Sequence, residues 1–201
     1  MVNDDRLPRD IVVIGGSAGA LQALFTLLGK LPRELPAIIA IVVHRHPFLS
    51  SKLLAVLDRH CPLPVMEVQD HEVLHSGRVY LAPRDRHLTF DDGMLDATRD
   101  AHQHRFRPAI DPLFVSAASE HASRVVGVIL SGGGEDGVAG LIAIKAAGGL
   151  SLVQDPNEAF SPSLPLNAIR KDDVDGVLKA ADLAVALEAL ASGRAVEVES
   201  V

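Results

Sequence analysis

The sequence predicts an α/β fold: a three-layer α/β/α arrangement with a doubly wound, mostly parallel sheet and an antiparallel hairpin insertion. Short apolar runs alternate with helical patterns, which is typical of strands that pair in parallel. The runs 38–43 and 125–130 are apolar throughout, and this indicates strands buried on both faces. In the middle of the chain, Asp91-Asp92-Gly93 separates two short strand patterns, which is a hairpin signal.

The N-terminal third predicts two strands and two helices in alternation. A short strand over 11–14 precedes a helix over 20–29, whose leucines share one face. Pro32 and Pro36 mark the return to the strand over 38–43, and a second helix follows over 50–59.

The middle of the chain predicts short strands, some of them antiparallel, between residues 65 and 97. One strand covers 79–82, and the hairpin pairs 87–90 with 94–97. Residues 99–107 are polar and without periodicity, so we expect a loop.

The alternation resumes after this loop. Asp111-Pro112 predicts a helix to about His121, with Asp111 as its N-cap. The other expected elements follow in order: strand 125–130, glycine-rich loop 131–137, helix 138–147, strand 150–153, helix 161–169 and helix 180–191. We expect a single domain over residues 1–201, with its core over about 10–192.

The composition narrows the class of protein. Hydrophobic residues make up 48% of the chain, which is ample for a core, and the net charge is −7. Aromatic residues make up only 3% and there is no tryptophan, so neither a basic surface nor a stacking platform for nucleic acid is expected. One cysteine excludes an internal disulfide, and we find no signal peptide or apolar run long enough for a membrane span. We therefore expect a cytoplasmic protein without membrane insertion.

The most informative motif is Gly15-Gly16-Ser17-Ala18-Gly19, directly after the first apolar run. It fits G-x-S-x-G, the pattern of a strained strand-to-helix turn that exposes a serine. A glycine-rich turn after a first strand is also common in nucleotide-binding sheets, so this motif alone is not decisive.

Polar side chains follow three of the predicted strands. Ser17 follows the first strand, His44 follows the second, and Asp136 lies in the loop after strand 125–130. Ligands bind at the carboxyl ends of strands in open parallel sheets, so these groups are expected to meet. Each has a simpler alternative, because His44 could cap a backbone carbonyl and Asp136 could be the N-cap of its own helix.

A hydroxyl, an imidazole and a carboxylate at one edge predict nucleophilic catalysis. Ser17 would attack a carbonyl, His44 would act as base and then acid, and Asp136 would orient His44. Backbone amides of Gly133 and of the serine turn at Ala18 would stabilise the oxyanion. Arg107 could bind acidic groups of a substrate, or serve a structural ion pair.

The sequence resembles the catalytic domain of the chemotaxis protein-glutamate methylesterase family (CheB type) from about residue 11 to 190. The resemblance is carried by the serine turn, His44, and three further motifs: Arg105-Phe106-Arg107-Pro108-Ala109-Ile110-Asp111, the segment from Gly127 to Gly137, and Ala147-Gly148-Gly149. It assigns the triad to Ser17, His44 and Asp136.

The resemblance implies a hydrolase for methyl esters of glutamate side chains on the cytoplasmic helices of chemoreceptors. Many family members also deamidate receptor glutamines, and none requires a metal or an organic cofactor. The family usually carries an N-terminal receiver domain, whereas about ten residues precede the first strand here. Either a separate receiver or other regulatory protein acts on the chain, or the chain was cut from a longer protein.

Several residues depart from the family pattern. Ala18 stands where threonine is common, Gly133 where methionine is common, and Glu135 where asparagine is common. Ser163-Leu164-Pro165 replaces a usual Gly-Met-Pro. These changes indicate a divergent member, and they favour as an alternative a catalytically weak module that binds receptors.

Two other enzyme classes are less consistent with the residues. His44 and His46 are spaced like a metal pair, with His71, His75, His102 or His104 as a third ligand, but loop histidines are usually solvated. The G-x-G-x-x-G pattern of dinucleotide-binding turns is not present. Counted from Gly15, its second and third glycines would fall on Ser17 and Ala20.

Overall fold

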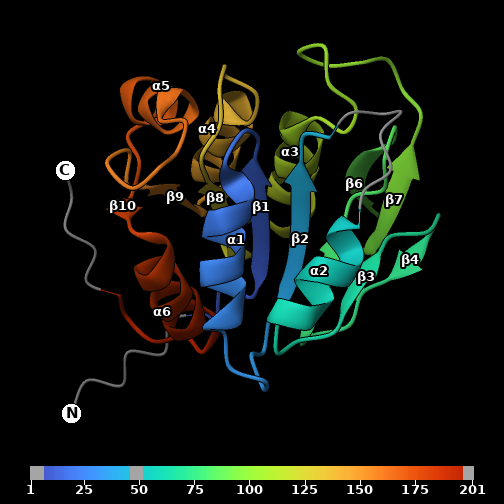
Figure 1. Cartoon of the computed structure of the whole chain (residues 1–201). Helices are drawn as coiled ribbons and strands as arrows, with labels where there is room; N and C mark the ends of the chain where they lie inside the picture. The colour runs from blue at the N-terminus through green and yellow to red at the C-terminus, as the bar shows by residue number, and fades with distance from the viewer. Residues whose placement is uncertain (1–6, 46–51, 197–201) are drawn as a thin grey trace.

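The computed structural model describes residues 7–45 and 52–196. Its centre is a sheet in which every pair of neighbouring strands is parallel, in the order β10-β9-β8-β1-β2-β5-β3 (Figure 1). The strands are β1 (Ile11–Gly16), β2 (Ile38–Val43), β3 (Val65–Glu67), β5 (Arg78–Leu81), β8 (Val125–Ile129), β9 (Leu150–Gln154) and β10 (Gly176–Leu178).

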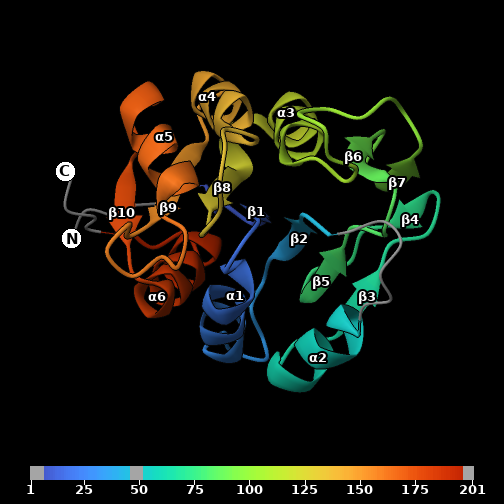
Figure 2. The same ribbon diagram turned by 45° about the horizontal axis from the view of Figure 1, so that its top comes forward.

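Helices cover both faces of this sheet, which confirms the predicted three layers (Figure 2). One face carries α1 (Ala20–Gly29), α2 (Leu53–His60) and α6 (Ala180–Ala191). The other carries α3 (Ile110–His121), α4 (Val138–Ala146) and α5 (Ser163–Lys171), and a short 3₁₀ turn, η1 (Ala122–Arg124), follows α3. Each face has its own apolar core, because successive side chains of a strand point to opposite sides.

A small antiparallel sheet extends the layer that contains α3. It has the order β4-β7-β6 and consists of β4 (Glu72–Val73), β6 (His87–Asp91) and β7 (Met94–Thr98). The pair β6 and β7 confirms the predicted hairpin around Asp92. The Phe90 N–H donates to Ser116 Oγ at 3.0 Å, which attaches the hairpin to α3.

The strand predicted over 79–82 is present as β5 and joins the parallel sheet. The sequence-based prediction differs from the fold in two places. The three-residue edge strands β3 and β10 are too short to show a periodicity. Helix α3 begins at Ile110 with Ala109 as its N-cap, so Asp111 is not its N-cap.

The register of the sheet determines which residues meet at its carboxyl edge. Strand β1 is the switch point, with β2 on one side and β8 on the other. Gly16 pairs with Val43, so Ser17 and His44 leave the sheet at the same level. The Ser17 N–H donates to the Ser131 carbonyl at 2.9 Å, which continues the ladder to the loop after β8.

None of the helices in the described ranges combines the length and apolar character needed to cross a lipid bilayer.

Candidate active site

Ser17 lies in the turn between β1 and α1. The turn is tight, because a Cβ at Gly16 would lie 2.6 Å from Ala20 Cβ and one at Gly19 would lie 2.5 Å from Phe160 Cβ. The left-handed conformation falls on Gly19 (φ 78°) and not on Ser17. The predicted turn is therefore confirmed, and Gly19 is its left-handed residue.

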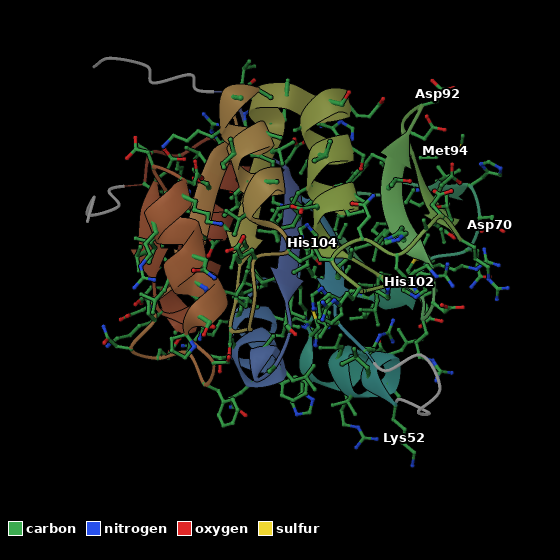
Figure 3. All side chains as sticks on the ribbon, turned by 90° about the horizontal axis from the view of Figure 1, so that it is seen from above. Lys52, Asp70, Asp92, Met94, His102 and His104 are labelled. Carbon is green, nitrogen blue, oxygen red and sulfur yellow. The ribbon has the colours of Figure 1, made fainter. Side chains whose placement is uncertain are left out.

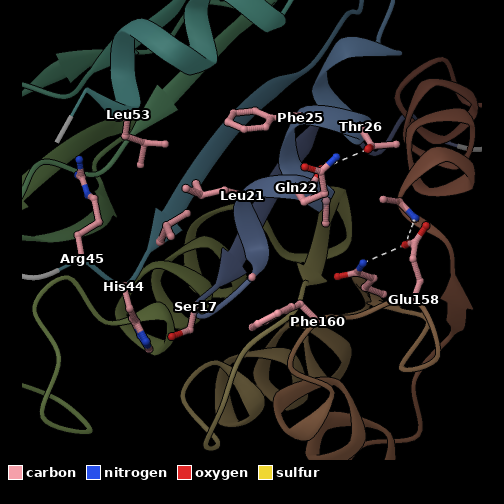
Figure 4. A pocket seen from close by; sticks show the side chains of 15 residues that line it. Ser17, Leu21, Gln22, Phe25, Thr26, His44, Arg45, Leu53, Glu158 and Phe160 are labelled. Carbon is pink, nitrogen blue, oxygen red and sulfur yellow. Dashed lines mark hydrogen bonds between the residues drawn. The ribbon is translucent and has the colours of Figure 1, made fainter.

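His44 and Asp136 form a direct pair beside this serine. His44 Nε2 lies 2.6 Å from Asp136 Oδ2, and both side chains are almost fully buried, at 4% and 2% exposure. A carboxylate only accepts, so Nε2 carries the hydrogen and Nδ1 keeps a lone pair. Nδ1 is buried without a hydrogen-bond partner in the described part of the chain. The Ser17 hydroxyl points toward the His44 ring (Figure 4).

The Asp136 carboxylate caps a helix other than its own. It accepts the N–H of Ile110 at 2.7 Å and the N–H of Asp111 at 3.1 Å, both in the first turn of α3. Helix α4, which follows Asp136, has Gly137 as its N-cap and no side-chain cap. Neither simple alternative holds, because Asp136 does not cap α4 and His44 binds a carboxylate and not a carbonyl. The N-terminus of α3 also stabilises a negative charge at this point.

Asp111 performs the reciprocal role for α4. Its Oδ1 accepts the N–H of Gly137 at 3.0 Å and the N–H of Gly140 at 2.8 Å. Its Oδ2 lies 2.9 Å from His104 Nε2. Burial raises the pKa of Asp111 above its ordinary value, and the charge of nearby Asp136 adds to the rise.

The loop 99–109 adds an aromatic residue to the site. Phe106 stacks on the His44 ring, with ring centroids 3.7 Å apart and an angle of 11° between the planes. Sequence reasoning did not single out Phe106. The available signal was a lone aromatic side chain in a polar loop, in a chain whose aromatic content is only 3%.

Arg107, the predicted substrate-binding residue, is held by neighbouring parts of the fold. Its Nε and one terminal nitrogen donate to Asp85 Oδ1 at 2.9 and 2.7 Å, and the other terminal nitrogen donates to the Asp100 carbonyl at 2.9 Å. This contact holds the pKa of Asp85 below its usual range. The side chain also borders a hollow beside Ser17, so contact with a substrate stays a prediction.

The glycine-rich loop after β8 places backbone close to Ser17. A Cβ at Gly132 would lie 3.0 Å from Ser17 Cβ, whereas one at Gly133 would have open space around it. The close approach therefore requires glycine at 132, a position that sequence reasoning passed over. In the described part of the chain, neither the Ala18 N–H nor the Gly133 N–H donates a hydrogen bond, and their role toward an oxyanion stays a prediction.

Glu135 forms an ion pair with a lysine of helix α5. Its carboxylate lies 2.6 Å from Lys171 Nζ on α5, and both side chains are about half exposed. The negative charge of Glu135, at a position where asparagine is common in the family, is thus paired with a lysine.

Two hollows meet at Ser17 and His44. One, of about 710 Å³, runs along α1 and has apolar walls that include Leu21, Phe25 and Phe160. The other, of about 460 Å³, lies under the loop 99–109. Its lining contains five basic residues and no acidic residue: His44, Arg45, His102, Arg105 and Arg107.

A group with metal-ligand atoms occurs at the same edge, but hydrogen bonds already account for it. In residues 7–45 and 52–196, the ligand atoms of His104, Asp111 and Asp136 lie within 4.8 Å of one another. Both carboxylates accept two backbone N–H groups and a histidine, so their burial is satisfied without an ion. His46, part of the predicted metal pair, lies outside the described residues.

Fold and site together define a doubly wound α/β protein in which a serine turn, an imidazole and a carboxylate meet at one sheet edge. The family model for CheB methylesterase matches residues 12–187. The chain belongs to the CheB methylesterase family.

Individual relatives agree with this assignment. A "Protein-glutamate methylesterase/protein-glutamine glutaminase 2" from Anaeromyxobacter dehalogenans is 37% identical over 181 residues, which cover 90% of this chain and 53% of the relative. A relative from Leptospira interrogans is provisionally named for the same activities and is 36% identical over 183 residues. The match covers 89% of this chain and 95% of the relative. The chain thus spans about half of the first relative and nearly all of the second.

A solved structure has the same fold. The crystal structure of the Thermotoga maritima CheB methylesterase catalytic domain has a TM-score of 0.85 and 32% identity. The match covers 90% of this chain and 98% of that one.

Proposed function

We propose that the protein is a serine hydrolase that removes methyl esters from glutamate side chains of chemoreceptors and deamidates receptor glutamines. The observation that carries this proposal is the buried 2.6 Å contact between His44 Nε2 and Asp136 Oδ2, with Ser17 directed toward the same ring (Figure 4). The family relationship supports the ester and amide substrates.

Acylation uses the unpaired His44 nitrogen. As Ser17 Oγ attacks the ester carbonyl carbon, the hydroxyl proton passes to His44 Nδ1, and Asp136 stabilises the imidazolium from the other nitrogen. The tetrahedral intermediate collapses, the proton moves to the methoxy oxygen, and methanol leaves. In deamidation the leaving group is ammonia.

Deacylation returns the site to its starting state. A water gives a proton to His44 Nδ1 and attacks the acyl carbon, and the Ser17 oxygen then regains that proton as the product leaves. The product is the glutamic acid side chain, which loses its remaining proton to water and becomes the carboxylate. The N–H groups of Ala18 and Gly133 stabilise the oxyanion in both steps, because they are unpaired in the described part of the chain.

The basic hollow supports an acidic partner. Three arginines and two histidines line it, in a chain whose net charge is −7. Chemoreceptor helices that carry glutamates beside the ester would place carboxylates near Arg107, whose guanidinium borders the hollow. The partner is therefore a cytoplasmic receptor helix, and the reaction takes place in the cytoplasm.

Methanol release from methylated receptor fragments tests the proposal. Wild-type protein is expected to release methanol, whereas Ser17→Ala is expected to release none at unchanged thermal stability. Turnover by Ser17→Ala would contradict the mechanism. A wild-type protein that binds the fragment without releasing methanol would indicate the binding module instead.

A further inference from the structure

Phe106 covers one face of the His44 imidazole, which no part of the proposed mechanism requires. The centroid distance of 3.7 Å is shorter than the 4.5–7 Å usual between aromatic rings, and the planes are nearly parallel at 11°. The Phe106 side chain is nevertheless 39% exposed. A phenylalanine whose role was to fill the core would be buried. Core packing therefore does not account for Phe106, and its contact with His44 is the feature that needs a physical reason.

The backbone around Phe106 adopts an uncommon conformation. His104 (φ 49°) and Arg105 (φ 70°) are consecutive non-glycine residues in the left-handed region, which such residues rarely adopt. Gln103 and Phe106 exchange two backbone hydrogen bonds across them, at 2.8 and 3.2 Å. These angles match a two-residue I′ turn, whose usual residues are asparagine and glycine. Phe106, which stacks on the His44 ring, is the last residue of this turn.

Three anchors fix the loop to the fold. His104 binds Asp111, and Asp111 holds the Gly137 N–H directly after Asp136. Arg107 binds Asp85. The third anchor is His87, whose Nε2 donates to the Ala101 carbonyl at 3.0 Å and whose Nδ1 accepts the Ala109 N–H at 3.2 Å. Figure 3, which looks onto this edge, shows His104 on the loop.

We infer that Phe106 is a positioning residue for His44, and that the turn at residues 103–106 serves to hold its ring there. This inference rests on the proposed function of His44 as the base. A ring packed flat on the imidazole restricts rotation about χ2, so Nε2 stays on Asp136 and Nδ1 stays toward Ser17. It also excludes water from one face, and its π-electrons attract the imidazolium that forms during the reaction.

Three substitutions at position 106 separate this role from other roles. Phe106→Tyr keeps the ring, Phe106→Leu keeps apolar bulk without a flat ring, and Phe106→Ala removes both. The assays are hydrolysis of p-nitrophenyl acetate, read as kcat and KM, and the rate at which a serine-directed phosphonate modifies Ser17. Val185→Ala, an exposed position on α6 far from the site, is the matched control.

The expected result is a split between kcat and KM. Phe106→Leu and Phe106→Ala should lower kcat and the phosphonate rate by about 10²-fold, as expected for a misplaced catalytic group, with KM within about threefold. Phe106→Tyr and Val185→Ala should match the wild type. Wild-type kcat in Phe106→Leu and Phe106→Ala would overturn the inference, and so would a rise in KM at constant kcat, which would make Phe106 only a wall of the pocket.

A spectroscopic measurement reads the stack without any turnover. Protons of the His44 ring lie over the face of Phe106 and should shift downfield in Phe106→Leu, while other histidine signals stay in place. Unmoved His44 signals would overturn the inference. Failure of the proposed function would give a different result. The wild-type protein would then release no methanol from receptor fragments, while the His44 signals would still shift in Phe106→Leu.

Discussion

Two histidine–aspartate pairs lie at the same edge of the sheet and differ in burial and in neighbours. The pair His44–Asp136 is almost fully buried, next to Ser17 and under Phe106. In the pair His104–Asp111 the imidazole is 49% exposed. Asp136 caps α3, which contains Asp111, and Asp111 caps α4, which follows Asp136. The two pairs therefore form one unit between α3 and α4.

The difference shows that a histidine–aspartate contact is not by itself a catalytic feature. In the proposed mechanism the buried pair orients a base beside the Ser17 hydroxyl, whereas the half-exposed pair anchors a loop. Substitutions in the two pairs should therefore have effects of very different size.

The largest effect is expected for the buried pair and its serine. Ser17→Ala and His44→Ala should each lower kcat by on the order of 10⁶-fold, because the nucleophile and the base act as a unit. Methanol release from methylated receptor fragments measures the loss, and circular dichroism checks the fold. A folded His44→Ala protein with more than a few per cent of wild-type activity would contradict the assignment.

Asp136→Asn should have the next largest effect, a fall in kcat of about 10⁴-fold. The Ile110 N–H binds Oδ2 and the Asp111 N–H binds Oδ1, so the single amide oxygen keeps only one of these hydrogen bonds, and the amide no longer fixes the His44 tautomer. The same methanol assay, with KM measured separately, tests this. A loss confined to KM would assign Asp136 a structural role alone.

His104→Ala should lower kcat by less than about fivefold. The His104 imidazole is half exposed, Asp111 keeps its hydrogen bonds to the Gly137 and Gly140 N–H groups, and Arg107 and His87 still hold the loop. A loss as large as that of His44→Ala would show that the two pairs are not functionally distinct. The comparison is made in one assay at one pH.

Asp111→Asn should change stability in a pH-dependent way. Burial raises the pKa of Asp111, so the folded state is penalised when this carboxyl ionises. Below about pH 4 both proteins are uncharged at 111 and should have similar unfolding free energies. As the pH rises through the raised pKa of Asp111, the wild type should lose stability, so the unfolding free energy of Asp111→Asn should rise relative to that of the wild type.

Urea unfolding at several pH values measures this difference. Asp111→Ala is the control, because it also removes the acceptor for the Gly137 and Gly140 N–H groups and should be less stable than Asp111→Asn by about 1–3 kcal/mol at every pH. A constant difference between Asp111→Asn and the wild type at all pH values would contradict the account.

Much of the architecture could be predicted because it follows local patterns. The elements α1, β2 and α6 coincide with their predicted ranges, and the hairpin follows from its Asp-Gly turn. The convergence of Ser17, His44 and Asp136 follows from parallel strands that end at one edge. The short edge strands could not be predicted, because a run of three residues shows no periodicity.

The capping arrangement could not be predicted from the sequence. Asp111 and Asp136 both stand at the start of a helix, so local rules assign each to its own helix. Only the packing of α3 against α4 shows that each carboxylate caps the neighbouring helix. Phe106 could not be predicted for a similar reason, because its partner His44 lies 62 positions earlier and the loop 99–107, which contains Phe106, has no periodicity.

The most direct test of the central claim is to map where a serine-directed phosphonate attaches. Intact-mass analysis followed by peptide sequencing should find one adduct, on Ser17, in the wild type and in His104→Ala, and none in His44→Ala. Adducts distributed over other serines, or undiminished labelling of Ser17 without His44, would contradict the claim that this imidazole activates this hydroxyl.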